Sequence, residues 1–133
     1  MKTVMIVDDA STVRMFHKML VTSPDRIIEE AENGIEALEK AIGTNVDLFL
    51  VDVNMPKMDG YRLCKEIRLN EALRAVPIIM ISTESANQDA ERAYQCGANY
   101  YKLWIYQRSP CSRLLIKSPR NCIKNCVIRP YHT

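Results

Sequence analysis

Long hydrophobic runs are absent from this chain, and so is a leader pattern at its start. No apolar stretch approaches the roughly 20 residues that a membrane-spanning helix needs, and Met1 leads directly into a short strand-like segment rather than a signal peptide. The hydrophobic fraction of 47% and the charged fraction of 26% are typical of a soluble globular protein. We therefore expect a cytoplasmic protein without a membrane partner.

Acidic residues are absent from the last quarter of the chain. Residues 102–133 hold seven Lys or Arg and no Asp or Glu, whereas residues 1–101 hold 11 basic and 16 acidic residues. This difference predicts a domain core at 1–101 and an atypical basic C-terminal segment at 102–133. The segment has three prolines and no clear helical or alternating period, so we predict no regular structure for it.

Cysteine occurs five times, an odd number, in a chain without an export signal. This usage argues for reduced thiols rather than a disulfide framework. Cys122 and Cys126 have the spacing of half a zinc site, but the sequence has no second closely spaced pair. We therefore expect no zinc.

Short apolar segments alternate with amphipathic ones along residues 1–101. Strands are expected at 3–7, 27–31, 48–52 and 77–82, with a fifth from Tyr100, and helices at 11–22, 34–42, 60–68 and 85–96. This alternation predicts right-handed crossovers and a parallel sheet with helices on both faces, which is an α/β fold. On the first helix, Arg14 and Lys18 are expected on a solvated face.

Three of the expected strands end on side chains that bind metals or phosphate. Asp8 and Asp9 follow the first strand, Asp52 ends the third, and Ser82 ends the fourth. Taken singly, these residues have a simpler explanation as helix caps or turn formers. Because the carboxyl ends of parallel strands share one edge of the sheet, we expect the four side chains to converge. Three converging carboxylates repel one another unless a hard cation such as Mg²⁺ joins them.

Asp52 is the candidate nucleophile of such a site. A carboxylate accepts a phosphoryl group to give an aspartyl phosphate, and Pro56 and Gly60 end regular structure just after Asp52. A metal ion and the Ser82 hydroxyl would position the transferring group and neutralise its charge. The sequence therefore predicts a Mg²⁺ pocket with room for one phosphoryl group.

Residues 1–101 resemble a response-regulator receiver domain of the single-domain chemotaxis type. The matching segments, in order, are Val7-Asp-Asp9, Asp52-Val-Asn-Met-Pro-Lys-Met-Asp-Gly60, Pro77-Ile-Ile-Met-Ile-Ser-Thr-Glu84 and Gly97-Ala-Asn-Tyr-Tyr101. The resemblance implies a flavodoxin-like (βα)5 three-layer sandwich with parallel strand order 2-1-3-4-5. It also implies a role in two-component signal transduction.

The resemblance implies an acceptor and a metal site. Asp52 is the residue that accepts the phosphoryl group. Asp8, Asp9, Asp52 and the backbone carbonyl of Asn54 are the implied Mg²⁺ ligands.

The resemblance further implies a conformational switch and two partners. Ser82 supplies the switch hydroxyl, and Tyr101 is the aromatic side chain that changes rotamer with it. A histidine kinase supplies the phosphoryl group, and a downstream target protein docks on the face formed by residues 83–101. The protein is expected to be a monomer or a weak dimer.

The end of the fifth strand departs from the family pattern. Receivers of this type carry a Lys-Pro pair there, followed by a final helix, and by spacing the lysine would fall near Trp104. The candidate for the phosphate contact is Lys102, two residues early. One nucleotide added after the Lys102 codon would, with suitable codons, turn Lys-Leu-Trp-Ile-Tyr into Lys-Pro-Val-Asp-Ile. We therefore hypothesise that residues 103–133 are an out-of-frame extension, which leaves the last strand and helix of the fold open.

The alternative for residues 103–133 is a genuine basic appendage that contacts acidic partners or nucleic acid by charge alone. The segment lacks the interleaved aromatic residues and fold signature that favour nucleic-acid binding.

For the whole chain, one alternative is a degenerate receiver that binds proteins without phosphorylation. The presence of Asp8, Asp9 and Asp52 argues against this alternative, and the missing Lys-Pro pair argues for it. Another is a small aspartyl-phosphate hydrolase, against which the lack of a cap domain counts. We expect no enzyme beyond Mg²⁺-dependent self-phosphorylation and autodephosphorylation.

Overall fold

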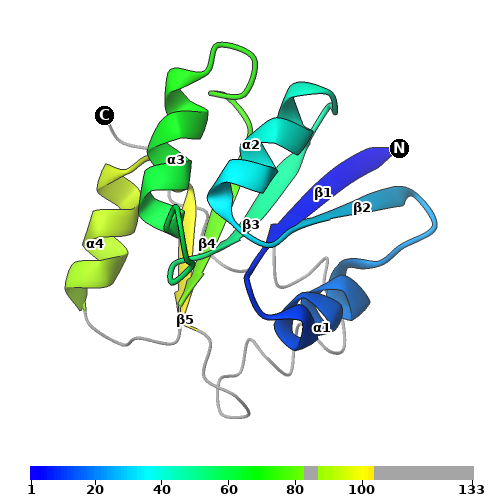
Figure 1. Ribbon diagram of the computed structural model, residues 1–133, viewed down its shortest axis with the longest axis horizontal. Coiled ribbons are helices and arrows are strands. Elements are labelled where there is room, and N and C mark those ends of the chain that lie inside the picture. Colours follow the sequence, from blue (N-terminus) through cyan, green and yellow to red (C-terminus); the bar gives the residue numbers. More distant parts are fainter. Residues whose placement is uncertain (83–86, 104–133) are drawn as a thin grey trace.

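Five parallel strands form the centre of the computed structural model, which describes residues 1–82 and 87–103 (Figure 1). Along the sheet their order is β2-β1-β3-β4-β5, and every neighbouring pair is parallel. The strands are β1 (Lys2–Val7), β2 (Arg26–Ala31), β3 (Leu48–Asp52), β4 (Ile78–Ser82) and β5 (Tyr100–Leu103). The predicted α/β class and strand order are confirmed, and β5 forms although its sequence left it open.

Four helices connect the strands: α1 (Ser11–Val21), α2 (Gly34–Ile42), α3 (Gly60–Leu69) and α4 (Asn87–Gln95). Side-chain caps fix two of the starting points. The Asn33 side chain accepts a hydrogen bond from the Glu36 N–H (2.9 Å), and the Asp59 side chain accepts one from the Arg62 N–H (2.8 Å). Each cap satisfies one of the backbone donors that a helix leaves unpaired at its N-terminus.

The helices cover both faces of the sheet, as the sequence predicted. Helix α1 lies apart from α2, α3 and α4 (Figure 1). Side chains of α2, α3 and α4 share one large hydrophobic cluster with alternate strand residues such as Met5 and Phe49. Helix α1 contributes Val21 to a smaller cluster with Ile6 and Leu50 on the other face. The alternation follows from the pleat, because successive side chains of a strand point to opposite faces.

Several predictions about segments need correction or fall outside the described residues. The helix expected at 85–96 is observed at Asn87–Gln95, with 83–86 undescribed. Lys102 and Leu103, for which no regular structure was predicted, form the end of β5. Residues 104–133, which make up the rest of the extension hypothesised at 103–133 and include Cys122 and Cys126, lie outside the described residues. Within the described ranges, no helix combines the length and apolar character needed to cross a bilayer.

Helix α1 corrects one expectation and confirms its neighbour. Lys18 is on a solvated face, with a side chain 49% exposed, but the side chain of Arg14 is only 11% exposed. Arg14 faces the end of β1 and the acids of β2, where its charge has partners. His17 is also buried, and desolvation lowers its pKa to about 4, so the imidazole is neutral at pH 7.

Arg68, near the end of α3, ties together the segments that enter β4 and β5. Its Nε donates to the Gly97 carbonyl (2.9 Å), and Nη1 donates to the carbonyls of Arg74 (2.9 Å) and Val76 (2.7 Å). Nη2 donates to the Asn99 side-chain oxygen at 2.7 Å. The planar guanidinium thus fixes the amino ends of two strands, at the edge opposite to Asp52.

Replacing Arg68 should destabilise the fold more than replacing an exposed arginine on the same helix. We expect Arg68→Met to lower the free energy of unfolding by about 2–4 kcal/mol, because several acceptors lose a charged donor. Arg62→Met, at an exposed position of α3, should change it by less than about 0.5 kcal/mol. Urea denaturation of the three proteins measures both values, and equal effects would contradict the proposed tie.

Candidate functional site

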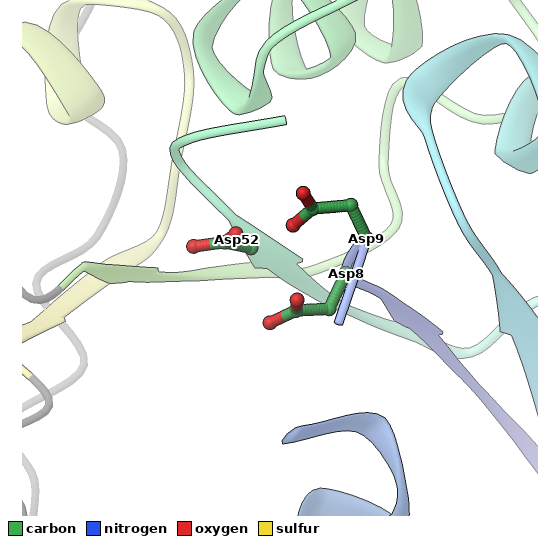
Figure 2. A group of neighbouring side chains, drawn as sticks. All are labelled: Asp8, Asp9 and Asp52. Carbon is green, nitrogen blue, oxygen red and sulfur yellow. The ribbon is translucent and has the colours of Figure 1, made fainter. Parts of the chain in front are cut away.

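Three carboxyl groups meet at the carboxyl edge of β1 and β3. Asp8 and Asp9 follow β1 and Asp52 is the last residue of β3, so the pairing of Val7 with Val51 brings them side by side. One oxygen from each residue lies within 4.8 Å of the others. Figure 2 shows the three carboxyl groups pointing to the same side. For the three acids, the arrangement is the convergence expected from the strand pattern.

The turn after β1 holds Asp8 firmly. Asp8 is 5% exposed, and its carboxylate accepts a hydrogen bond from the Ala10 N–H at 2.9 Å. Its own N–H donates to the Ala31 carbonyl of β2 at 3.1 Å. Burial raises the pKa of Asp8, and the hydrogen bond from Ala10 opposes that rise. The ionised carboxylate is therefore held in place but poorly solvated.

The pKa of the Asp52 carboxyl group is strongly raised. Burial raises its pKa to about 7, and the nearby charge of Asp8 adds to the rise. A hydrogen bond from the Asn54 backbone N–H acts in the opposite direction, and Asp9 adds a smaller repulsion. A hard divalent cation between the oxygens would remove this repulsion, and Mg²⁺ prefers such ligands. The residues present therefore fit a magnesium ion.

The loop after Asp52 is fixed by its backbone. Val53 donates its N–H to the Ile81 carbonyl (3.1 Å), and Gly60 donates its N–H to the Val53 carbonyl (2.9 Å). A Cβ at Gly60 would lie 2.3 Å from the Asp52 carbonyl oxygen, so a larger residue does not fit. Lys57 has a φ of 67°, in the left-handed region that costs energy for a residue with a Cβ. The loop returns tightly to the end of β3.

The remaining predicted site residues lie on β4 and β5. Ser82 is 1% exposed at the end of β4, the strand next to β3. Tyr101 packs partly buried against the larger hydrophobic cluster. Lys102 aligns with Ile81, which aligns in turn with Asp52, so Lys102 and Asp52 occupy one row of the sheet, two strands apart. Ser82 thus follows Ile81, the partner of Asp52 on the neighbouring strand, and Tyr101 and Lys102 lie one strand farther along the sheet.

Arg14 is the residue near the site that sequence reasoning missed. Its Nη1 donates to the Asp8 carbonyl at 2.7 Å, and its Nε lies 3.4 Å from a Glu30 carboxylate oxygen. Its charge also lowers the pKa of Asp8, against the effect of burial. The available signal was an arginine in the second turn of the helix after Asp8, combined with acids on the neighbouring strand.

A parallel sheet of this order, with acids at the carboxyl ends of two central strands, defines a doubly wound α/β protein with a cation or phosphate site. Comparison with known families shows which family of doubly wound proteins the chain belongs to. The response regulator receiver domain matches residues 4–102, and the chain belongs to this family. Members of the family are phosphoacceptors of two-component systems.

Two curated relatives show the extent of the similarity. The chain is 35% identical over 98 residues to the Gliding motility regulatory protein of Myxococcus xanthus. The aligned residues make up 74% of this chain and 13% of that protein. The chain is 32% identical over 98 residues to Protein PilG of Pseudomonas aeruginosa. The aligned residues make up 74% of this chain and 73% of PilG. The chain therefore spans only a small part of the longer relative.

Two solved structures share the fold. The chemotaxis protein CheY4 of Vibrio cholerae superposes with a TM-score of 0.78 at 27% identity, over 92% of this chain and 98% of that one. The second structure is the response regulator protein TrrA of Thermotoga maritima in complex with Mg²⁺-BeF. It superposes with a TM-score of 0.71 at 27% identity, over 88% of this chain and 98% of that one.

The raised pKa of Asp52 predicts a pH-dependent cost to stability in metal-free buffer. The folded pKa of about 7 lies above the unfolded value of roughly 3.9. Stability that comes from the protonated carboxyl is therefore complete below about pH 4 and is lost as the pH rises to about 7. Asp52→Asn cannot lose a proton, so at pH 8 it should exceed the wild type in unfolding free energy by about 2–4 kcal/mol.

Urea denaturation in metal-free buffer at pH 4 and pH 8 measures this difference. The two proteins should differ little at pH 4, because Asp52 is then protonated in the folded state and about half protonated in the unfolded state. Magnesium added at pH 8 should stabilise the wild type more than Asp52→Asn. A difference that is the same at both pH values would contradict the assigned cause.

Proposed function

We propose that Asp52 accepts a phosphoryl group from a histidine kinase and that the chain acts as a Mg²⁺-dependent phosphoacceptor. The observation that carries the proposal is the meeting of Asp52 with Asp8 and Asp9 within 4.8 Å, at the carboxyl edge of a receiver-domain sheet. The proposed metal ligands are these three carboxylates and the Asn54 carbonyl. The Mg²⁺-BeF complex of TrrA supports a site of this kind.

In the proposed reaction, an oxygen of the ionised Asp52 carboxylate attacks the phosphorus atom of a phosphohistidine. The new P–O bond replaces the P–N bond, and the imidazole leaves with the bonding pair. Bound Mg²⁺ supplies positive charge to the phosphoryl oxygens. The Asn54 N–H holds the carboxylate that attacks, and the Ser82 hydroxyl, at the end of the adjacent strand, binds a phosphoryl oxygen. Water attacking the same phosphorus would return the chain to its starting state.

Lys102 is proposed as the second cation at the phosphoryl group. Strand spacing puts its Cα about 9–10 Å from that of Asp52, and both residues belong to the row that contains Ile81. Tyr101 packs against the cluster on one face, so strand alternation directs Lys102 to the other. A long lysine side chain crossing Ile81 would bring its ammonium group toward the phosphoryl oxygens.

Loss of the Lys102 charge should slow phosphorylation without abolishing it. We expect Lys102→Met to lower the rate with a small phosphoryl donor by about tenfold, which corresponds to roughly 1.4 kcal/mol of barrier. Lys65→Met, at an exposed position of α3, serves as the control and should keep the wild-type rate. Stopped reactions followed by intact mass give both rates. A wild-type rate in Lys102→Met would remove this lysine from the proposed mechanism.

The proposed signal is a change in the surface formed by residues 83–101, of which the structure describes residues 87–101. Ser82 would bind the phosphoryl group at one end of this surface, and Tyr101 would change rotamer with it. Tyr101 now donates its N–H to the Tyr94 hydroxyl oxygen of α4 at 3.4 Å. A downstream target protein would dock here in the cytoplasm. We propose that the chain does so as a monomer or weak dimer.

The central test is intact mass after incubation with acetyl phosphate. The wild type should gain one phosphoryl group in the presence of Mg²⁺, and none in metal-free buffer. Asp52→Asn should gain none under either condition, because its amide is a poor nucleophile.

No adduct on folded wild-type protein would overturn the phosphoacceptor proposal in favour of a receiver that binds partners without phosphorylation. Continuous release of phosphate from a free ester, in excess over protein, would instead indicate a hydrolase.

A further inference from the structure

Arg14 joins three segments that are far apart in the sequence. Its Nη1 donates to the backbone carbonyl of Asp8 at 2.7 Å, in the turn after β1. Its Nε lies 3.4 Å from a Glu30 oxygen and its Nη2 4.0 Å from a Glu32 oxygen, on and just after the edge strand β2. The Arg14 side chain is 11% exposed, whereas the side chains of Glu30 and Glu32 are 37% and 69% exposed. One guanidinium on α1 therefore fixes a turn against a strand edge.

The contact to Asp8 completes the set of bonds around that residue. Its N–H donates to Ala31 and its carboxylate accepts from Ala10, while its carbonyl accepts from Arg14. The two backbone bonds fix the peptide planes on both sides of the residue. The direction of the Asp8 side chain, which points with Asp52 toward the same side in Figure 2, depends on those planes.

Arg14 could affect the proposed Mg²⁺ site through its charge or through its hydrogen bond to Asp8, and the hydrogen bond is the better-supported route. A cation beside three carboxylates would by itself repel Mg²⁺. Glu30 and Glu32 offset that charge, and Lys18 lies 3.7 Å from the second Glu30 oxygen. The formal charges of Arg14, Lys18, Glu30 and Glu32 therefore cancel within the group, although the charge of Arg14 still lowers the pKa of Asp8.

We propose that Arg14 is a positioning residue for magnesium binding, which holds the turn of Asp8 and Asp9 so that both carboxylates face the cation. The inference rests on the proposed function, since it concerns the same site. Partners of metal ligands outside the coordination sphere typically change metal affinity by about 10- to 100-fold. Arg14 bonds to the backbone of a ligand rather than to its carboxylate, so we expect the lower end of that range.

Calorimetric titration of the full chain with MgCl2 tests the proposal directly. Arg14→Met keeps the apolar stem and removes the guanidinium, and its Kd for Mg²⁺ should rise about tenfold. Lys18→Met is the matched control, because it removes a charge from the same helix and from the same partner, Glu30. Its Kd should stay within about twofold of the wild type. Equal weakening in both variants would assign the effect to charge and overturn the proposal.

Phosphorylation by acetyl phosphate at increasing Mg²⁺ separates positioning from general damage. For Arg14→Met, the half-saturating Mg²⁺ concentration should rise about tenfold, while the rate at saturating Mg²⁺ stays within about twofold. A fall in the saturated rate without a rise in half-saturating Mg²⁺ would overturn the proposal.

Arg14→Lys keeps the charge and provides a second variant should Arg14→Met fail to fold. A single ammonium cannot reproduce the planar fork that contacts Asp8 and Glu30 together, so its Mg²⁺ affinity should stay at least about threefold below the wild type. Wild-type affinity in Arg14→Lys would overturn the proposal, and so would a wild type that binds no Mg²⁺. A wild type that binds Mg²⁺ but gains no phosphoryl group would refute only the proposed function and leave the calorimetric result standing.

Discussion

Repulsion among three carboxylates at one edge of a sheet is the constraint on which the rest of this structure depends. Asp8 and Asp52 are held there by parallel pairing of β1 with β3, and neither can turn away into water without breaking backbone hydrogen bonds. Burial raises the pKa of both groups, and repulsion between neighbouring carboxylates adds to the rise, so their ionised forms are costly in the absence of a cation. A bound cation such as the proposed Mg²⁺ would remove that cost.

Much of this arrangement could be predicted from the sequence because it depends on local patterns. Apolar runs that end on Asp8 or Asp52 identify strands and their ends, and the alternation with amphipathic helices requires parallel pairing. Convergence of the acids follows from that topology alone. The metal-ligand role of the Asn54 carbonyl and the switch role of Ser82 were implied by the family resemblance, because neither residue type specifies such a role by itself.

The parts that could not be predicted depend on contacts across the fold. Helical periodicity put Arg14 on a polar face, but whether that face meets water or Glu30 is decided by how α1 lies on the sheet. In the same way, the position of Lys102 was counted along the chain, whereas its distance from Asp52 is set by the register of β5 against β4. Long polar side chains that reach between elements leave no periodic signal in the sequence.

The bonds of Arg68 lie at the amino ends of β4 and β5, whereas Ser82 and Lys102 lie toward their carboxyl ends. Arg68 consequently ties the two strands together at the end opposite to the proposed phosphoryl site. Sliding of β5 along β4 would break the hydrogen bonds of Arg68 to both segments. A displacement of β5 near Ser82 would therefore keep these bonds more easily as a small rotation about its amino end than as a translation along β4.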